Sequence, residues 1–389
     1  MAAVVVILGV AMMIIVHEGS HFVAAKAFNM KATEAFFGFG PTLVSTTKGE
    51  TEYGVKAIPL GGYVRIIGMN PFEEIDADDE ERTYRAAPFW KKSIVVLAGI
   101  MSHLVVAFAL FAVVAMIWGA PKTVIGDDGK PTAVASTTVG SVAPTVDGRP
   151  TPAAASGIEV GDEIVSFNGD PIAEWSDFGD HASAHGDEEV VVGVIRDGQY
   201  VELTTTLTTV SRPVVVDGEP VEDAAGNQVM EERGFFGISP ALEMEPVGPI
   251  QAIGRGVGDL GQSIVQSVQG LWLMIINFPK VVAATFGAGD GEILDTARPI
   301  SPIGLVQISD TMRDALVLLA LVNVFVAVLN VVPLYPLDGG HFAVALYEKV
   351  RGRTPDVRKL MPVAVAVFAF VVALGLIGIY LDIFNPIEL

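Results

Sequence analysis

Four long runs of apolar residues constrain the fold of this chain more than any other feature. Each run is close to the ~20 residues that cross a bilayer as an α-helix, and 51% of the 389 residues are hydrophobic. The runs are about Ala2–Phe28, Ser93–Trp118, Ala315–Pro333 and Met361–Phe384. We therefore expect a membrane α-helical protein with four transmembrane helices.

The first run differs from a secretory signal peptide. No Lys or Arg precedes it, and it carries His17, Glu18 and His21 where a signal peptide would be apolar. We interpret it as a helix of the mature protein.

The positions of the basic residues predict the orientation in the membrane. Of the 24 Lys and Arg residues, nine lie in residues 26–92 and five in residues 349–359. The other ten are spread over residues 122–313, which are rich in Asp and Glu. Because positively charged loops stay on the cytoplasmic side, we expect the long middle segment to lie outside the cytoplasm. The chain would then be a multi-pass protein of the cell membrane.

Charge and cysteine content exclude several classes of function. The formal net charge of −21 argues against nucleic acid as a partner, because phosphate binding needs clustered Lys and Arg. The chain contains no cysteine, which excludes disulfides, zinc ribbons and thiol catalysis. Any bound metal must therefore be held by histidine and carboxylate.

Changes in composition along the chain predict four regions. They are two spans with a cytoplasmic β-hairpin between them, an extracytoplasmic domain, a β-rich extension with an amphipathic membrane-surface helix, and two further spans with a cytoplasmic loop. Their bounds are 1–120, 121–212, 213–311 and 312–389. The helix expected over Pro249–Gly287 has a competing interpretation as a fifth span, which would place Arg255 and Asp259 in lipid.

The second region has the pattern of a small α+β domain. Short apolar strands are separated by turns such as Asn168-Gly169 and Asp197-Gly198, with a helix near Glu174–Ala184. The stretch Ser156–Gly169 resembles the central strand and turn of bacterial PDZ domains. That resemblance implies binding of a peptide C-terminus at a sheet edge. The alternative is a spacer with a closed groove.

The first apolar run contains the sequence His17-Glu18-Gly19-Ser20-His21. Its two histidines stand one helical turn apart on the same face, so both can reach one metal ion. Glu18 beside them can act as general base toward a water that the metal acidifies. Ionisable groups inside a bilayer are costly unless they pair or bind something. The motif therefore predicts metal-assisted hydrolysis within a membrane span.

Asp338 is the best candidate for the third ligand that a zinc hydrolase needs. It follows the third apolar run, where Pro333 and Pro336 break the helix and Gly339-Gly340 free the backbone beyond it. A carboxylate there can turn inward. His341 is a rival ligand, and its simpler interpretation is a surface or second-shell residue.

Two motifs together resemble the site-2 protease family of intramembrane zinc metalloproteases. They are His-Glu-x-x-His in the first span and Asn-x-x-Pro-x-x-x-Leu-Asp-Gly, beginning at Asn330, in the third. Further matches are Pro59–Tyr63, the PDZ-like domain and Pro299–Gly304. With one such domain, the chain is most similar to the single-PDZ bacterial members, especially the actinobacterial regulators of intramembrane proteolysis.

The resemblance implies a set of roles. One Zn²⁺ would be bound by His17, His21 and Asp338, with Glu18 as the base. Substrate backbone would be held by Asn330 and by a β-structure that includes Gly61, Gly62 and Tyr63, for which an ordinary hairpin is the alternative. The substrate would be a single-span membrane protein, such as an anti-sigma factor after a first cut or a remnant signal peptide.

One position departs from the family pattern. Members often carry Gly-Pro-x-x-Asn in the second span, whereas this chain has Gly99-Ile100-Met101-Ser102-His103. The role of that Asn therefore does not carry over. His103 could bind substrate, approach the metal, or be a packed and hydrogen-bonded second-shell residue.

Two rival functions are weaker. A metal transporter predicts inverted repeats, which the sequence does not contain. An inactive membrane scaffold acting through its PDZ-like domain leaves Glu18 in lipid without a task.

Overall fold

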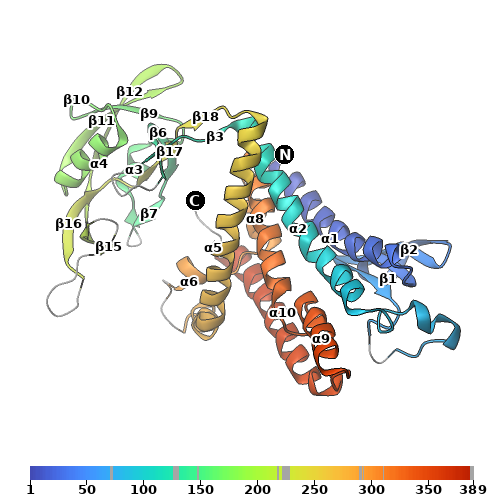
Figure 1. The fold of residues 1–389 in the computed structure, drawn as a ribbon. Coiled ribbons are helices and arrows are strands. Elements are labelled where there is room, and N and C mark those ends of the chain that lie inside the picture. The colour runs from blue at the N-terminus through green and yellow to red at the C-terminus, as the bar shows by residue number, and fades with distance from the viewer. Residues whose placement is uncertain are drawn as a thin grey trace. The chain divides into compact units, whose positions relative to one another are not determined.

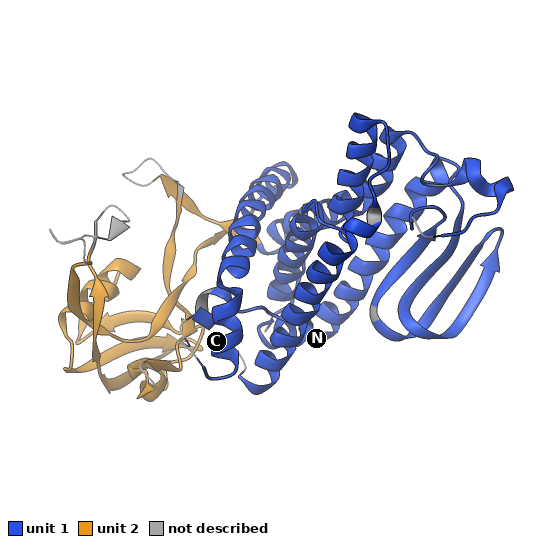
Figure 2. Cartoon of the chain, turned by 90° about the horizontal axis from the view of Figure 1, so that it is seen from below, with its two compact units in different colours: residues 1–118, 247–387 blue, residues 119–246, 388–389 orange. Residues whose placement is uncertain are grey.

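The computed structural model describes residues 1–70, 73–125, 131–146, 149–216, 219–220, 228–288, 291, 293–309 and 311–385. The chain forms two compact units (Figure 2). Unit 1 comprises residues 1–118 and 247–387, and unit 2 comprises residues 119–246 and 388–389.

Unit 1 is mainly helical, as expected. Five of its described helices are long and apolar enough to cross a bilayer: α1 (Ala2–Ala27), α2 (Phe89–Trp118), α5 (Pro249–Thr285), α8 (Met312–Val331) and α10 (Met361–Phe384) (Figure 1). The shorter ones are η1 (Ala77–Arg82), α6 (Ile293–Ala297), α7 (Pro302–Gln307), α9 (Asp338–Arg351) and η2 (Val357–Lys359). The four expected spans are all among the five, and α5 is the additional one.

Helix α5 is a member of the helical unit. Gly256 lets it approach α2, because a Cβ there would lie 3.3 Å from atoms of Ala112 and Phe108. Farther along, Leu260 and Ile264 pack on a buried cluster of α2 and α8. These contacts join α5 to the helical unit, and the number of spans stays a prediction.

Helix α8 packs closely against α1. A Cβ on Gly9 would overlap the end of the Leu319 side chain, so glycine lets this leucine pack directly against the backbone of α1. Small residues at helix contacts allow backbones to approach in membrane proteins. The N-terminal ends of both helices share a buried cluster that includes Ala2, Val6 and Ala315. This packing brings the C-terminal half of α8 toward the His-Glu-x-x-His turn of α1.

The expected hairpin forms a more folded sheet than the sequence suggested. Strands β1 (Ala32–Lys48) and β2 (Thr51–Ile66) are both long, and Phe36 of β1 lies opposite both Gly54 and Tyr63 of β2. The register therefore gives four rows, in the order 62–66, 32–37, 51–55 and 42–48. The row 62–66 is an edge with no further strand beside it in the described chain.

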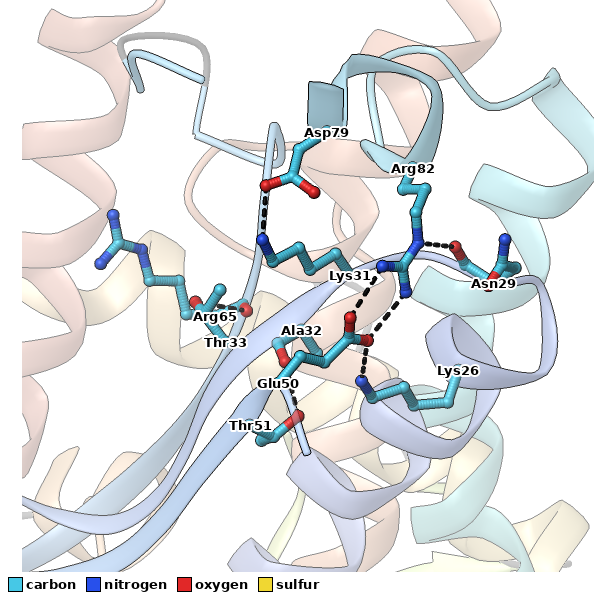
Figure 3. Close-up of polar contacts among 10 residues, drawn as sticks. All are labelled: Lys26, Asn29, Lys31, Ala32, Thr33, Glu50, Thr51, Arg65, Asp79 and Arg82. Atoms are coloured by element: carbon cyan, nitrogen blue, oxygen red, sulfur yellow. Dashed lines mark hydrogen bonds and ion pairs between the residues drawn. The ribbon is translucent and has the colours of Figure 1, made fainter. Parts of the chain in front are cut away.

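An ion-pair network fixes the base of this sheet to the end of α1 (Figure 3). The two oxygens of Glu50 accept hydrogen bonds from the Arg82 guanidinium at 2.7 and 2.8 Å, and Lys26 of α1 also pairs with Glu50. Arg82 and then Lys26 hold the pKa of Glu50 down, at about 2. Lys31 pairs with Asp79 beside them. The sheet is thereby held at a fixed position along α1.

Unit 2 is built on a six-stranded sheet with two helices, α3 (Pro152–Ser156) and α4 (Trp175–Ala184). The order is β12-β11-β9-β6-β17, with β10 on β9; the strands are β6 (Ala135–Val142), β9 (Glu163–Phe167), β10 (Asp170–Pro171), β11 (Glu189–Arg196), β12 (Gln199–Thr206) and β17 (Ile238–Leu242). The expected helix is α4. The expected turns have Asn168 and Asp197 at positive φ, 50° and 51°.

The remaining strands of unit 2 are short pairs: β3 (Ala120–Pro121) with β18 (Met244–Glu245), β4 (Thr123–Ile125) with β5 (Pro131–Ala133), β7 (Thr145–Val146) with β8 (Arg149–Pro150), β13 (Thr208–Pro213) with β16 (Met230–Phe235), and β14 (Val215–Val216) with β15 (Glu219–Pro220).

Strand β17 comes from the region expected to form a separate extension, and it closes one side of β6. Ser239 lies opposite Ser141, and Pro240 lies opposite Val139. Because β9 pairs with the other side, β6 offers no free edge for an added strand. The PDZ assignment itself stays a prediction.

Candidate active site

Three candidate metal ligands come together from two helices. The Oδ2 atom of Asp338, on the first residue of α9, lies 3.6 Å from Nε2 of His17 and 3.4 Å from Nε2 of His21. The two imidazole Nε2 atoms are 3.3 Å apart. One atom from each residue lies within 4.8 Å of the other two, a spacing that could hold a metal ion.

The connection between α8 and α9 turns the Asp338 carboxylate inward. Helix α8 ends at Val331, and two prolines interrupt the link that follows. A Cβ on Gly339 would overlap the carbonyl oxygen of Val331, and one on Gly340 would overlap the backbone of Tyr335. Both glycines lie within α9, so their function is close packing. Their helical backbone differs from the expectation that they free the chain, and Asp338 as third ligand stays a prediction.

Helix α2 orients His21. The Nδ1 atom of His21 lies 2.7 Å from the carbonyl oxygen of Val95, which can only accept, so Nδ1 donates and Nε2 is left for a metal. One turn later, a Cβ on Gly99 would overlap Nε2 of His21 and lie 2.8 Å from Cε1 of His17. Glycine at this position lets α2 approach the two imidazoles.

The residues fit a bound zinc ion. Buried polar atoms are nearly always hydrogen-bonded, yet Oδ2 of Asp338 is buried without a hydrogen-bond partner. Two imidazoles and one carboxylate are the ligand set of a catalytic zinc site, which leaves a fourth position for water or substrate. An unpaired carboxylate oxygen facing two Nε2 atoms is therefore explained if a cation lies between them.

Glu18 lies against the edge of the β-sheet. Its Oε2 atom accepts a hydrogen bond from the backbone N–H of Val64 at 3.1 Å. Beside it is a largely apolar cavity of about 490 Å³, whose lining includes Ile14, Phe36 and Tyr63. The carboxylate of the motif thus connects the metal ligands to the row 62–66 of β2.

The expected substrate-binding residues lie on and near this edge. Gly61 has a φ of 144°, and a Cβ there would lie 2.6 Å from the Phe39 ring. Gly62 adjoins Glu18, and the Tyr63 hydroxyl donates to Glu34 at 2.6 Å. Asn330 is half-buried in the last turn of α8. The geometry brings Gly62 to the site, and the roles of all four stay predictions.

The two other candidate histidines, His103 and His341, lie beside the three-ligand group and outside it. His103 stacks on His17, with ring centroids 4.8 Å apart, and its Nδ1 lies 2.9 Å from Oδ1 of Asn323. His341 packs against Tyr335, with ring centroids 4.5 Å apart. Asn323, which is 1% exposed, was missed by the sequence reasoning. Its signal was an amide in the middle of an apolar run.

This geometry defines a class of enzyme. Two imidazoles and a carboxylate converge on one point, a second carboxylate lies beside them, and the motif sits in a helix long and apolar enough to cross a bilayer. The combination is that of a metal-dependent hydrolase embedded in a membrane.

Comparison with known proteins agrees with this classification. A family model described as peptidase family M50 matches residues 5–385. The zinc metalloprotease Rip1 of Mycobacterium tuberculosis is 32% identical over 98% of this chain and 97% of its own length, and Rip1 of Mycolicibacterium smegmatis is 31% identical with the same coverage. The metalloprotease MmpA of Caulobacter vibrioides is 29% identical over 87% of this chain and 84% of its own.

The chain therefore belongs to peptidase family M50, the site-2 proteases. It is a zinc metalloprotease and a multi-pass membrane protein. The expected family, enzyme class and cofactor are confirmed.

Proposed function

We propose that this protease hydrolyses a peptide bond within or near the transmembrane segment of a single-span membrane protein. The observation that carries the proposal is the position of the two histidines of the ligand group, on an apolar helix of 26 residues and beside a strand edge that no other strand of the described chain covers. A substrate reaching this group from the bilayer would present a peptide bond of its own span.

In the proposed mechanism, His17, His21 and Asp338 hold zinc through the atoms that converge in the structure. A zinc ion held there would polarise the scissile carbonyl and make a bound water more acidic. Glu18 takes the proton of the attacking water and delivers it to the leaving nitrogen. The Val64 N–H occupies Oε2 of Glu18 and leaves Oε1 for the proton transfer.

The row 62–66 is proposed to bind the substrate as an added strand. A peptide bond inside a helix is shielded by its own hydrogen bonds, so cleavage requires local unwinding. The backbone of this edge can replace the lost helical bonds with strand pairing, through groups other than the Val64 N–H, which already donates to Glu18. Because Val64 also contacts Glu18, a strand added here would run past the base.

The substrate class and orientation follow from the family resemblance and the charge distribution. We propose cleavage on the cytoplasmic side of the cell membrane, of an anti-sigma factor after a first cut or of a remnant signal peptide. Unit 2 would lie outside the cytoplasm. We propose that unit 2 limits the size of substrates or binds a peptide C-terminus. Since β17 already occupies one side of β6, an added strand would pair with the outer side of β17, the end of the sheet in the described chain.

The mechanism is tested by Glu18→Gln. This variant keeps one zinc per chain, because Glu18 is not among the converging ligands, and it lowers cleavage at least about a hundred-fold, the range for loss of a general base. Zinc is measured by elemental analysis, and cleavage with a single-span substrate in vesicles. Glu52→Gln, the same change at a residue of β2 outside the ligand group, is the control. Unchanged cleavage by Glu18→Gln would refute the mechanism.

The ligand assignment is tested separately by Asp338→Ala. This variant should lose most of its zinc, since two imidazoles alone hold the ion weakly. His341→Ala should retain zinc, because His341 lies outside the converging group. The reverse pattern would make His341 the third ligand.

A further inference from the structure

A buried pair on α2 and α8 offers the site a hydrogen-bond acceptor that the proposed mechanism does not use. His103 is 2% exposed and Asn323 is 1% exposed. The Nε2 atom of His103 is buried and has no hydrogen-bond partner, although the ring stacks on the candidate ligand His17. A buried polar atom without a partner destabilises the fold, so it calls for an explanation.

The hydrogen bonds of Asn323 determine which nitrogen of His103 carries the proton. The Asn323 amide nitrogen donates to the carbonyl oxygen of Leu319 at 2.7 Å, so the amide oxygen faces His103. That oxygen can only accept, and it lies 2.9 Å from Nδ1, so Nδ1 carries the hydrogen. In the neutral imidazole, Nε2 then presents a lone pair. Asn323 therefore fixes His103 as an acceptor.

A substrate bound as a strand needs such an acceptor. Its backbone groups point alternately to two sides, and the edge of β2 can pair with only one side. The N–H groups on the other side would be unpaired in a site closed off from water, at a cost to binding. At the active site, β2 contacts the motif at Glu18, whereas His103 stacks on His17. Strand β2 and His103 therefore contact different residues of the motif.

We propose that Nε2 of His103 accepts a hydrogen bond from a backbone N–H of the extended substrate, on the side that β2 does not pair, and that Asn323 is the positioning residue for this contact. The proposal rests on the proposed function. It assigns His103 to substrate binding, and not to the metal: its nitrogens are not part of the group whose atoms lie within 4.8 Å of one another.

The experiment measures substrate binding in the zinc-loaded Glu18→Gln protein, which binds without cleaving. The probe is a fluorescent single-span peptide of about 25 residues with a Gly-Pro pair at its centre, in vesicles. His103→Phe keeps the aromatic stack and removes the acceptor, so the dissociation constant should rise about tenfold. Asn323→Leu should raise it about threefold, because the Nδ1 proton is then no longer fixed. Zinc content should stay at one per chain in both.

The double variant separates a functional pair from two structural defects. If Asn323 acts only through His103, then His103→Phe with Asn323→Leu binds no more weakly than His103→Phe alone. Val105→Ala, on the same helix at a residue that is 60% exposed, is the control and should bind normally.

Three results would overturn the proposal: unchanged binding by His103→Phe, a loss of zinc in that variant, or additive effects in the double variant. Failure of the parent Glu18→Gln protein to bind the peptide is a different result. It would contradict the proposed function, and the assignment of His103 with it.

Discussion

The two units treat their buried polar groups differently. Among the described residues, the buried side-chain atoms without hydrogen-bond partners all belong to unit 1, and three of them are in His17, His103 and Asp338. In unit 2, the buried carboxylate of Asp162 is paired with Arg196 at 2.7 Å and accepts from the Glu159 backbone. Unit 2 satisfies its polar groups within its own fold, whereas unit 1 leaves the atoms at its active site available to a ligand.

The largest expected effect in this comparison is that of Gly99→Ala in unit 1. The added methyl would overlap His21 and crowd His17, so zinc affinity should fall by about 10- to 100-fold, the range for disturbed outer-shell positions. Gly179→Ala in α4 of unit 2, where an added Cβ meets nothing within 4 Å, is the matched control. Zinc titration measures both. Normal zinc affinity in Gly99→Ala would mean that the ligand geometry tolerates movement of α2.

A smaller effect is expected at Glu50, because unit 1 also contains fully paired groups away from its active site. Glu50→Gln should lower the free energy of unfolding by about 1 kcal/mol, since the pair is partly exposed. The folded-state pKa of Glu50, about 2, lies below its ordinary 4.5. Its contribution is therefore complete above pH 4.5 and is lost as the pH falls toward 2.

Thermal unfolding of the wild type and Glu50→Gln at pH 6 and pH 3 checks this sign. The difference between them should shrink at the lower pH. A difference that grew on acidification would contradict the ion-pair assignment at the base of the sheet.

The smallest effect is expected in unit 2. Ser141 and Ser239 are opposite, exposed residues of β6 and β17, and the chain has no other thiol to interfere with a disulfide between cysteines placed there. Oxidised Ser141→Cys/Ser239→Cys should cleave substrate at the same rate as its reduced form, because β17 stays on β6 during function. A rate that falls on oxidation and recovers on reduction would show that β6 must open to receive a peptide.

The parts of the active site that are local in sequence could be predicted. The i, i+4 spacing of His17 and His21 fixes their common face, and an isolated carboxylate after a proline-broken helix pointed to Asp338. The turns at Asn168 and Asp197 follow from residues that tolerate positive φ. These features depend on nearest neighbours along the chain.

The parts that were missed depend on contacts between distant segments. Asn323 and His103 are 220 positions apart in the sequence, and β6 and β17 are separated along the chain by the strands β7 to β16. The four rows of the β1–β2 sheet arise because both strands fold back on themselves, which alternation alone does not reveal. The fifth apolar helix was recognised as an alternative, and its polar face left the number of spans undecided.

The hydrogen bond between His21 and the carbonyl oxygen of Val95 limits how a substrate can reach the catalytic centre. A transmembrane segment that separated α1 from α2 would pull this carbonyl away and release the imidazole that the metal needs. A substrate that approached along the edge of β2 would leave this bond intact, because that edge contacts α1 at Glu18 and not at His21. The bond that orients a candidate ligand would therefore oppose entry of a substrate between α1 and α2.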